Sequence, residues 1–251
     1  MANRSNILAL IPAAGDGRRF EQGASPKQYA PLCGRTVLEC TIERLREGLR
    51  PQVIGVVLSP NDTHFARLRR TEAGIVPLYC GGATRAESVT NGLRALAQKI
   101  EVDESDWIAV HDAARPCVPL TCLRTLRALV ESAPPESKAG ALLALPLRDT
   151  LKEARENHDG TIRVVVTYDR NRFWTAQTPQ IFRYTVLKEA LALRDAKAST
   201  DEAQAVERWC ADNFLPLPQL MRGSAHNIKI TYREDLAVAE AILTYQKGAS
   251  S

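Results

Sequence analysis

The stretch ILALIPAAGDGRRF, residues 7–20, decides the fold. Residues 7–11 form an unbroken apolar run of strand length, and this run leads into a small, glycine-rich segment. A short apolar run bounded by glycine is typical of a strand that is buried on both faces, as in a parallel sheet. The stretch therefore predicts a central parallel strand followed by a loop at its carboxyl end.

The rest of the chain alternates short apolar runs with apolar residues at helical spacing. The pattern predicts strands at residues 53–58, 75–79, 107–110, 139–145 and 228–230, and helices at residues 37–49, 84–98, 120–130, 184–193 and 202–209 and after residue 231. Thr84 and Glu87 have the spacing of a capping box. Strands alternating with helices predict an α/β fold with a mostly parallel, doubly wound sheet. We expect a single domain over residues 1–246 and a disordered tail at residues 247–251.

Residues 147–175 break this alternation. A turn at Asn157-His158-Asp159-Gly160 joins Thr150-Leu151-Lys152 to a β-branched run at residues 161–167, which predicts a protruding β-hairpin arm. A lone hairpin is marginally stable in water and leaves open strand edges. We therefore expect the arm to pack against a second copy of the chain, giving a homodimer.

Composition excludes several classes of protein. The 251 residues are 45% hydrophobic and 25% charged, with a formal net charge of +4, which suits a globular protein that binds small anions better than one that binds nucleic acid. No apolar run approaches the roughly 20 residues of a membrane span. The six cysteines have no metal-binding spacing and are expected to be free thiols. The first residues lack a signal-peptide pattern, so we expect a cytoplasmic protein.

The glycine-rich segment at residues 12–20 suits phosphate binding. Glycines let backbone N–H groups approach phosphate oxygens, and Arg18, Arg19 and Lys27 add positive charge nearby. The Gly-Lys-Ser/Thr ending of a P-loop is missing. Phe20 stands where a dinucleotide fingerprint needs a third glycine or alanine. The alternative is a glycine turn with solvated arginines, but the glycine pair, the arginine pair and the Pro26-Lys27-Gln28 triplet together favour a nucleotide site.

A second polar segment, His111-Asp112-Ala113-Ala114-Arg115-Pro116, follows the strand predicted at residues 107–110. In open parallel sheets ligands bind beyond the carboxyl ends of the strands. Asp112 there can hold a magnesium ion, which bridges one or two carboxylates to substrate phosphates, and Arg115 can bind a phosphate. The alternative is that Asp112 is a turn or capping residue and Arg115 a surface charge.

These two segments, together with several later motifs, resemble the 2-C-methyl-D-erythritol 4-phosphate cytidylyltransferases of the non-mevalonate isoprenoid pathway. The later motifs occur in family order and are Gly81-Gly82 with Arg85 and Ser88, Arg148-Asp149-Thr150, Asp169-Arg170, Trp174, Gln177-Thr178-Pro179-Gln180, Thr200-Asp201-Glu202-Ala203 and Asn227-Ile228-Lys229-Ile230-Thr231. Nearly the whole chain is covered. The resemblance implies a Rossmann-like nucleotidyltransferase fold with a dimerisation arm, CTP and 2-C-methyl-D-erythritol 4-phosphate as substrates, and Mg²⁺ as cofactor.

The resemblance also implies roles for individual residues. Arg19 and Lys27 would stabilise the α-phosphate of CTP in the transition state, and Asp112 would hold the metal. Nucleotide contacts would come from Pro12, Ala13, Ala14, Gly15, Gly17, Lys27, Gly82, Arg85, Ser88, Asp112 and Ala113. The acceptor would be held by Asp112, Arg115, Thr150, Arg170, Thr178, Thr200 and Lys229. The family's arm crosses to the partner, so Thr150 and Arg170 would complete the partner's site. Purely structural roles remain open for Thr178, Thr200 and Lys229.

Two residues depart from the family pattern. Ala83 stands where many members carry an acidic residue after the glycine pair, a departure that concerns recognition of the base, and Tyr168 replaces a small apolar residue or proline before Asp169. Three alternative functions remain: a cytidylyltransferase for another polyol phosphate such as ribitol 5-phosphate, a nicotinamide-dependent oxidoreductase, and a nucleotide-sensing module without turnover.

Overall fold

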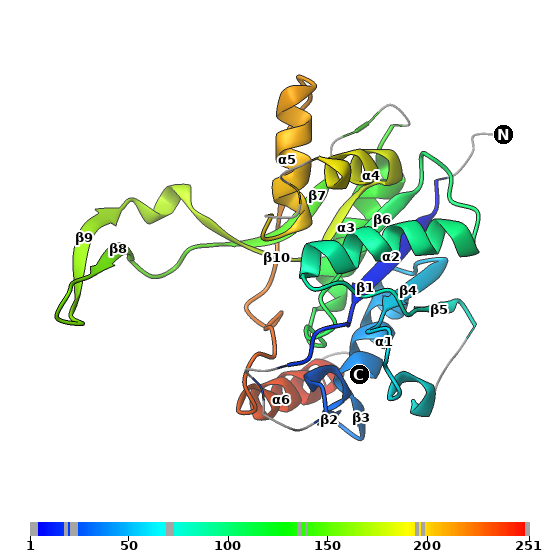
Figure 1. Ribbon diagram of the computed structural model, residues 1–251, viewed down its shortest axis with the longest axis horizontal. Coiled ribbons are helices and arrows are strands. Elements are labelled where there is room, and N and C mark those ends of the chain that lie inside the picture. Colours follow the sequence, from blue (N-terminus) through cyan, green and yellow to red (C-terminus); the bar gives the residue numbers. More distant parts are fainter. Residues whose placement is uncertain are drawn as a thin grey trace.

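A seven-stranded sheet forms the centre of the computed structural model, which describes residues 5–17, 20, 25–68, 73–134, 137–138, 140–193, 196 and 199–248 (Figure 1). Its strands are β1 (Ile7–Pro12), β4 (Val53–Val57), β5 (Ile75–Leu78), β6 (Trp107–Val110), β7 (Ala141–Pro146), β10 (Trp174–Arg183) and β11 (Gln219–Arg222). They lie in the order β11-β7-β10-β6-β1-β4-β5. All neighbours pair in parallel except β10, which runs antiparallel to both β6 and β7. The predicted mostly parallel α/β sheet is therefore confirmed.

Helices cover both faces of this sheet. On one face, α2 (Arg85–Lys99), α4 (Tyr184–Ala192) and α5 (Glu202–Asp212) pack against apolar side chains of β1, β6 and β7. On the other face, α1 (Val37–Gly48) and α3 (Leu120–Ser132) pack against the alternate residues of the same strands. The strands are therefore buried on both sides, as their unbroken apolar runs predicted. Among the described residues, no helix has the length and apolar character needed to cross a membrane.

Smaller elements complete the described chain. Three short 3₁₀ turns are η1 (Lys27–Tyr29), η2 (Phe65–Arg67) and η3 (Arg170–Arg172). The two-residue strands β2 (Pro31–Leu32) and β3 (Arg35–Thr36) pair beside the C-terminal helix α6 (Asp235–Gly248), as Figure 1 shows. Helix α6 continues to Gly248, so it includes the first two residues of the predicted tail, 247 and 248, and residues 249–251 lie outside the described part.

The start of α2 differs in one detail from the predicted capping box. The Thr84 hydroxyl accepts the Glu87 N–H at 3.1 Å, as expected for an N-cap. The Glu87 carboxylate accepts the N–H of Ala83 at 3.0 Å, one residue before the cap. The reciprocal half of the box therefore secures the turn at Gly82-Ala83.

The sequence analysis missed two strands of the central sheet and predicted one strand that does not form. No strand was predicted over residues 174–183, yet β10 lies inside the sheet between β6 and β7. Strand β11 at the sheet edge was also missed. Conversely, residues 228–230 form no strand, because the Ile230 N–H makes a single bond to the Ala114 carbonyl (2.8 Å) and no ladder follows.

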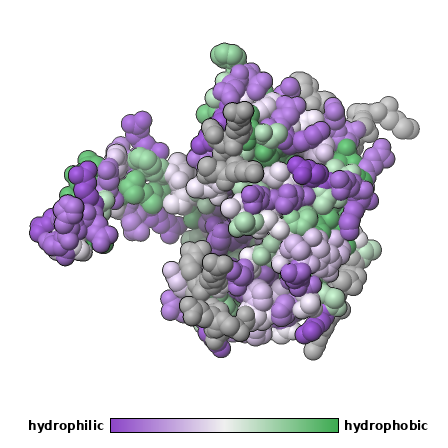
Figure 2. All heavy atoms as spheres, in the orientation of Figure 1, coloured by the Kyte–Doolittle hydropathy of each residue, from purple (hydrophilic) through white to green (hydrophobic). Residues whose placement is uncertain are grey.

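The predicted hairpin is confirmed. Among the described residues, strands β8 (Leu151–Glu156) and β9 (Ile162–Tyr168) pair only with each other, in an antiparallel sheet closed by a turn in which Gly160 has a φ of 77°. Figure 1 shows this arm, residues 147–175, projecting far from the central sheet. Apolar side chains are exposed along it, with Ile162 72% and Val164 62% exposed, and they form the green patches on the arm in Figure 2. Two strands alone bury too little apolar surface to be stable in water, so the arm needs a further surface to pack on.

Candidate active site

The loop at residues 13–17 follows β1 and is held by Gln28. The Gln28 side-chain amide donates to the carbonyls of Ala13 (2.6 Å) and Gly15 (3.2 Å). A Cβ added at Gly15 would meet no described atom within 4 Å, so the backbone there faces open space. Gly17 has a φ of 70°, and a Cβ there would lie 3.2 Å from the backbone nitrogen of Lys27. Glycine at 17 therefore permits both the left-handed turn and the close approach to Lys27.

Lys27 joins this loop to a distant part of the chain. It is the first residue of η1, and its ammonium donates to the Ile230 carbonyl at 2.8 Å. Ile230 directly follows Lys229 in the sequence. The contact therefore brings the ammonium of Lys27 to the backbone segment that carries Lys229. Lysine ammonium groups beside a glycine loop suit a ligand that carries several phosphates.

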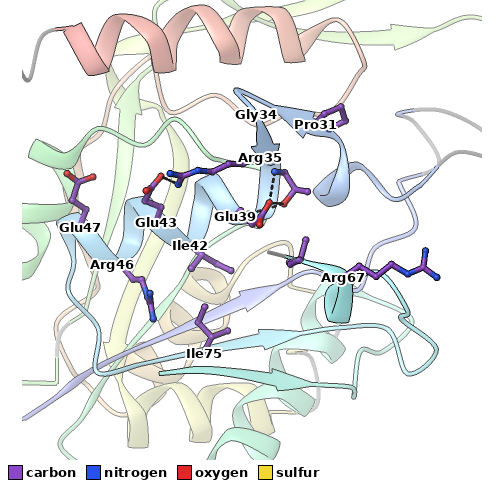
Figure 3. Close-up of a pocket in the computed structure, with 12 residues that line it drawn as sticks. Pro31, Gly34, Arg35, Glu39, Ile42, Glu43, Arg46, Glu47, Arg67 and Ile75 are labelled. Carbon is purple, nitrogen blue, oxygen red and sulfur yellow. Dashed lines mark hydrogen bonds and ion pairs between the residues drawn. The ribbon is translucent and has the colours of Figure 1, made fainter. Parts of the chain in front are cut away.

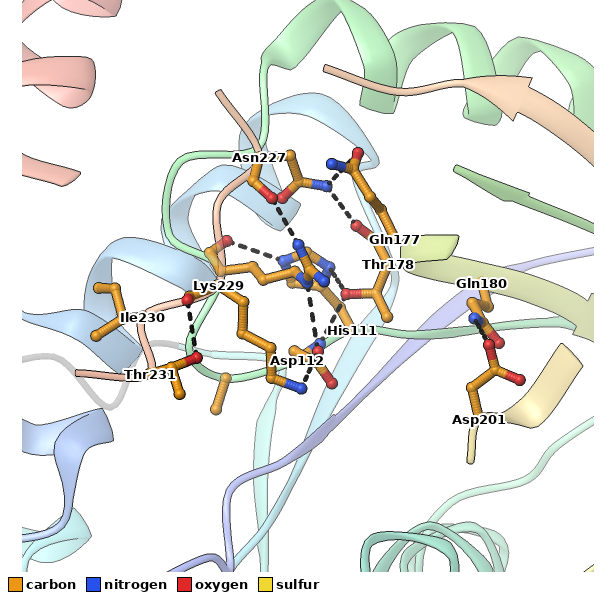
Figure 4. Close-up of polar contacts among 12 residues, drawn as sticks. His111, Asp112, Gln177, Thr178, Gln180, Asp201, Asn227, Lys229, Ile230 and Thr231 are labelled. Atoms are coloured by element: carbon orange, nitrogen blue, oxygen red, sulfur yellow. Dashed lines mark hydrogen bonds and ion pairs between the residues drawn. The ribbon is translucent and has the colours of Figure 1, made fainter. Parts of the chain in front are cut away.

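Asp112 is the centre of an ionic cluster just beyond β6. Its Oδ1 lies 3.1 Å from Arg85 Nε, and its Oδ2 lies 3.3 Å from Arg115 Nε and 2.8 Å from Lys229 Nζ. Figure 4 shows Lys229 reaching over Asp112 from its own segment. The Asp112 residue is 6% exposed, whereas the Lys229 side chain is 40% exposed. The cluster therefore has a buried carboxylate at its base, and Lys229 is the most exposed of its three cations.

The cations keep Asp112 ionised in spite of its burial. Burial alone would raise the pKa of this carboxyl, but Arg85, Lys229 and Arg115 together hold it well below its ordinary value. For Arg85, burial works to lower the pKa, and the carboxylates of Glu202 and Asp112 outweigh it. Arg115 differs, because its burial lowers the pKa by more than Asp112 raises it. The pairs with Asp112 are therefore pairs of full charges, arranged around one carboxylate.

A chain of hydrogen bonds orients the backbone of Asp112. Its N–H donates to Thr178 Oγ1 (3.0 Å), which lies 3.0 Å from His111 Nδ1, and His111 Nε2 lies 3.1 Å from the Arg115 carbonyl (Figure 4). Since a carbonyl oxygen only accepts, His111 carries its proton on Nε2, and the Thr178 hydroxyl donates to Nδ1. Burial lowers the pKa of His111 to about 4. His111 is thus a neutral, structural side chain and not a base.

His111 makes stability depend on pH. Its pKa of about 4 in the folded chain lies below the ordinary 6.5, so between these values the unfolded chain binds more protons and stability falls as pH falls. We expect wild type to lose about 3 kcal/mol more unfolding free energy than His111→Gln between pH 6.5 and 4. Urea unfolding at each pH measures this, with His158→Gln in the exposed arm turn as the control. Parallel pH curves for wild type and His111→Gln would contradict it.

The turn before α2 and the first turn of the helix carry three of the residues that were predicted to contact the nucleotide. The Gly82 N–H donates to Ser88 Oγ (3.1 Å), and the Ser88 hydroxyl bonds to the Thr84 carbonyl (2.9 Å). A Cβ at Gly82 would lie 2.5 Å from Glu87 Cβ, so the turn requires glycine. Ser88 is 4% exposed and fixes the turn, while Arg85 reaches from the first residue of α2 to Asp112. This turn therefore faces the same edge of the sheet as the loop after β1.

Other predicted residues lie apart from the cluster or outside the described part. Ala113 is buried, and its carbonyl accepts from Thr41 Oγ1 at 2.9 Å. Thr200 is exposed, and its N–H donates to Gln204 Oε1 at 2.8 Å. Arg170 donates to the Arg148 carbonyl within the arm, and no described contact joins Arg170 or Thr150 to Asp112. Arg18 and Arg19 lie outside the described residues.

Three residues beside the cluster were given no role by the sequence analysis. Gln28 holds the loop after β1, and Glu202 lies 2.5 Å from Arg85 Nη1. Asn227 is fully buried, its side-chain amide donates to the Thr178 carbonyl (2.8 Å), and its backbone carbonyl accepts from Arg115 (2.6 Å). Each is a polar residue in a short motif, but its partner lies 13 to 117 positions away, so sequence alone gives no signal of the contact.

A separate pocket lies away from this cluster. Its volume is about 890 Å³, and α1, β3 and η2 contribute to its walls (Figure 3). Ile42 and Ile75 give it an apolar part, whereas Arg35 pairs with Glu43 and Glu39 closes the capping box of α1. The charges of Arg35, Glu39 and Glu43 therefore help to hold α1 and β3, and none of the residues in the Asp112 cluster lines the pocket.

The chain is similar to known proteins over almost its whole length. A family model described as IspD, 2-C-methyl-D-erythritol 4-phosphate cytidylyltransferase, matches residues 7–245. The enzyme of that name from Nitrosomonas eutropha is 45% identical over 239 residues, covering 94% of this chain and 96% of its own. The one from Dechloromonas aromatica is 44% identical over 242 residues, covering 95% and 98%.

Solved structures give the same result. A crystal structure of 4-diphosphocytidyl-2C-methyl-D-erythritol synthase superposes with a TM-score of 0.78 at 36% identity, covering 96% of this chain and all of that one. The 2-C-methyl-D-erythritol 4-phosphate cytidylyltransferase of Francisella tularensis superposes with a TM-score of 0.75 at 32% identity, covering 95% of this chain and all of that one. Both the sequence and the fold of the chain are therefore similar to one kind of enzyme over nearly their full length.

Proposed function

The chain belongs to the 2-C-methyl-D-erythritol 4-phosphate cytidylyltransferase family, and we propose that it carries out the family reaction at the Asp112 cluster. It transfers CMP from CTP to 2-C-methyl-D-erythritol 4-phosphate, a step of isoprenoid precursor synthesis. The observation that carries the proposed location is a glycine loop beside three cations that converge on one buried carboxylate.

Lys27 is proposed to stabilise the reacting phosphate. An oxygen of the acceptor phosphate attacks the α-phosphorus of CTP, the bond to the β-phosphate oxygen breaks, and pyrophosphate leaves with the electron pair. The attacking group is already an anion, so the chain supplies alignment and positive charge and needs no nucleophile of its own. Lys27 lies between the loop after β1 and Ile230, where the α-phosphate would be placed by a nucleotide bound on that loop. Arg19 is proposed to act with it.

The proposed nucleotide cradle consists of small residues around this loop. Their side chains are short enough to leave backbone N–H groups accessible to phosphate oxygens. The cradle comprises Pro12, Ala13, Ala14, Gly15 and Gly17, and Ala113 adjoins it after β6. We propose that Gly82, Arg85 and Ser88 lie around the cytosine and ribose. The fixed turn at Gly82 supports this placement, because its backbone is held by Ser88 and Glu87.

The acceptor phosphate is proposed to bind to Arg115 and Lys229. Both cations contact Asp112 Oδ2 and come from segments that flank the carboxyl end of β6. Thr178 joins this group through Asp112, since its hydroxyl accepts the Asp112 N–H. Thr200, which is exposed just before α5, is proposed to bind the acceptor directly.

Magnesium is proposed to accompany the nucleotide. Mg²⁺ in such sites keeps several waters and takes one or two carboxylates plus substrate phosphates. Asp112 is ionised and lies beside the loop, and its Oδ1 has Arg85 as its described cationic partner, so that oxygen can accept a further contact. No group of three potential metal ligands occurs among the described residues. The residues therefore fit a metal that arrives with CTP, and when bound it would neutralise charge on the triphosphate.

The arm is proposed to cross to a second copy of the chain. Its exposed apolar residues need cover, and its two open strand edges would otherwise pair nonspecifically. In this arrangement Thr150 and Arg170 complete the acceptor site of the partner subunit. Figure 1 shows the arm projecting away from the central sheet of its own chain, which supports an action on the partner.

Mixing two inactive variants tests the crossing. Lys27→Ala removes a residue of a subunit's own site, whereas Arg170→Ala would damage the partner's. In a mixture, about half of the dimers pair the two variants, and each such dimer holds one intact site, so activity should recover to about one quarter of wild type. Each variant alone should stay inactive. If the mixture is shown to exchange subunits and its activity still does not recover, the proposed crossing of the arm is contradicted.

A substrate comparison tests the acceptor. The relatives and the family model name 2-C-methyl-D-erythritol 4-phosphate, which disfavours ribitol 5-phosphate and the oxidoreductase and sensor alternatives. We expect faster turnover with 2-C-methyl-D-erythritol 4-phosphate than with ribitol 5-phosphate at equal CTP. Faster turnover with ribitol 5-phosphate would contradict the proposed acceptor.

A cytoplasmic location is also proposed. All six cysteines are free, as expected in a reducing compartment. Fractionation of cells that express the chain tests this, and recovery in an extracellular or membrane fraction would contradict it.

A further inference from the structure

Glu202 is a buried carboxylate beside the site, and none of the roles proposed above uses it. Its side chain is 1% exposed, and its Oε1 lies 2.5 Å from Arg85 Nη1. Its Oε2 is buried with no hydrogen-bond partner among the described residues. Burial raises the pKa of Glu202 against the opposing effect of Arg85. The carboxylate is therefore buried, which disfavours its charged form, and Arg85 is its described ionic partner.

Several contacts fix the backbone that carries Glu202. It is the first residue of α5, directly after the N-cap Asp201. The Gln180 side chain donates to Asp201 Oδ2 (2.8 Å, Figure 4) and accepts the Ala203 N–H (2.8 Å). Gln180 lies on β10 and pairs with Val110 of β6, and Val110 precedes Asp112 by two residues. The start of α5 is therefore tied to the strand end that carries Asp112.

Arg85 consequently lies between two carboxylates on different elements. Its Nε contacts Asp112 Oδ1 at 3.1 Å and its Nη1 contacts Glu202. Two contacts from separate nitrogens of a planar guanidinium fix both its position and its plane. Lysine has a single ammonium and cannot reproduce this geometry.

Stability is a weak reason for such a pair. Replacing a buried ion pair with well-packed apolar residues is often neutral or stabilising, since desolvation offsets much of the attraction. A glutamate in the first turn of a helix gains from the helix dipole, but an exposed one gains as well. The pair is therefore better explained by its effect on Arg85, whose guanidinium it holds in one position and one plane.

We propose that Glu202 is a positioning residue that keeps Arg85 on Asp112 while the triphosphate is bound. The inference rests on the proposed site for cytidylyl transfer. A triphosphate attracts guanidinium groups strongly, so Arg85 held only by Asp112 would turn toward the phosphates. Asp112 would then lose a partner and its orientation toward Arg115 and Lys229. Glu202 opposes this movement, because its own carboxylate is fixed at the start of α5.

Kinetics of Glu202→Gln test the proposal. The variant keeps the shape of the side chain and removes its charge. We expect kcat to fall about 10- to 100-fold, with CTP affinity, measured by calorimetry without acceptor, unchanged or tighter. Arg85→Lys should show a similar fall in kcat. Because Glu202 acts through Arg85, the double variant should lose no more than Arg85→Lys alone.

Controls separate this role from a structural one. Glu39→Gln neutralises another first-turn glutamate, at the start of α1 and away from the cluster, and should turn over normally. Multiplicative losses in the double variant, or a normal kcat for Glu202→Gln, would overturn the proposal. If Glu202→Gln does not fold, a normal kcat for Arg85→Lys overturns it instead. Wild type is measured in the same assay. A lack of turnover by wild type would contradict the proposed function and would not bear on Glu202.

Discussion

With Asp112 replaced by alanine, kcat is expected to fall by about 10³-fold, the scale on which loss of a preorganised electrostatic group slows an enzyme. The carboxylate holds Arg85, Arg115 and Lys229 together, and without it the three cations repel one another. Steady-state rates of pyrophosphate release measure the effect. Unfolding free energy should also fall, by about 2 kcal/mol, which is less than for a fully buried pair because Lys229 is 40% exposed.

Asp103→Ala is the matched control for this variant. Asp103 lies before β6, at the opposite end of the strand, and its carboxylate accepts from the Ser105 N–H at 2.8 Å. This variant should keep wild-type activity. An Asp112→Ala protein that folds and turns over at the wild-type rate would contradict the role given to the cluster.

Replacement of Lys27 with alanine is expected to lower kcat by about 10³-fold with little change in CTP affinity. The ammonium is proposed to act on the charge that develops at the α-phosphorus, so its loss raises the barrier more than it weakens ground-state binding. Pre-steady-state turnover and calorimetric CTP binding measure the two quantities separately.

Lys99→Ala provides the matched control for Lys27. The Lys99 ammonium also donates to a backbone carbonyl, that of Pro77 at 3.2 Å, but it lies at the end of α2 and not at the proposed site. Its replacement should leave kcat unchanged. Equal losses in the two lysine variants, or a loss of CTP affinity alone in Lys27→Ala, would contradict the proposed role.

The apolar strands of the fold were predictable because each carries its own signal. Strands β1, β4, β5 and β6 are short apolar runs, and burial of β1, β4 and β6 on both faces imposes that composition. Strand β10 has no such signal, since its buried residues include Gln177, Gln180 and Arg183. Their polar groups are satisfied by distant partners, such as the Ser224 carbonyl for Gln177 (2.9 Å) and the Ser137 carbonyl for Arg183 (3.1 Å). Periodicity cannot reveal a strand whose burial depends on contacts formed only after folding.

The candidate site was predictable to a similar degree. Asp112 and Arg115 were placed at a strand end by their position after an apolar run, and the structure brings Arg85 and Lys229 to them. Lys229 was expected on a strand but lies in an irregular segment. Glu202 was missed, because a helix N-terminus followed by alanines gives no reason to expect a buried ion pair with a residue 117 positions earlier.

The central claim is that CMP transfer occurs at the Asp112 cluster beside Lys27. Its most direct test is pyrophosphate release from CTP and magnesium, with and without 2-C-methyl-D-erythritol 4-phosphate, for wild type, Lys27→Ala and Asp112→Ala. We expect release by wild type that requires the acceptor, and its collapse in both variants while they remain folded. Release that is independent of the acceptor, or that persists at the wild-type rate in either folded variant, would contradict the claim.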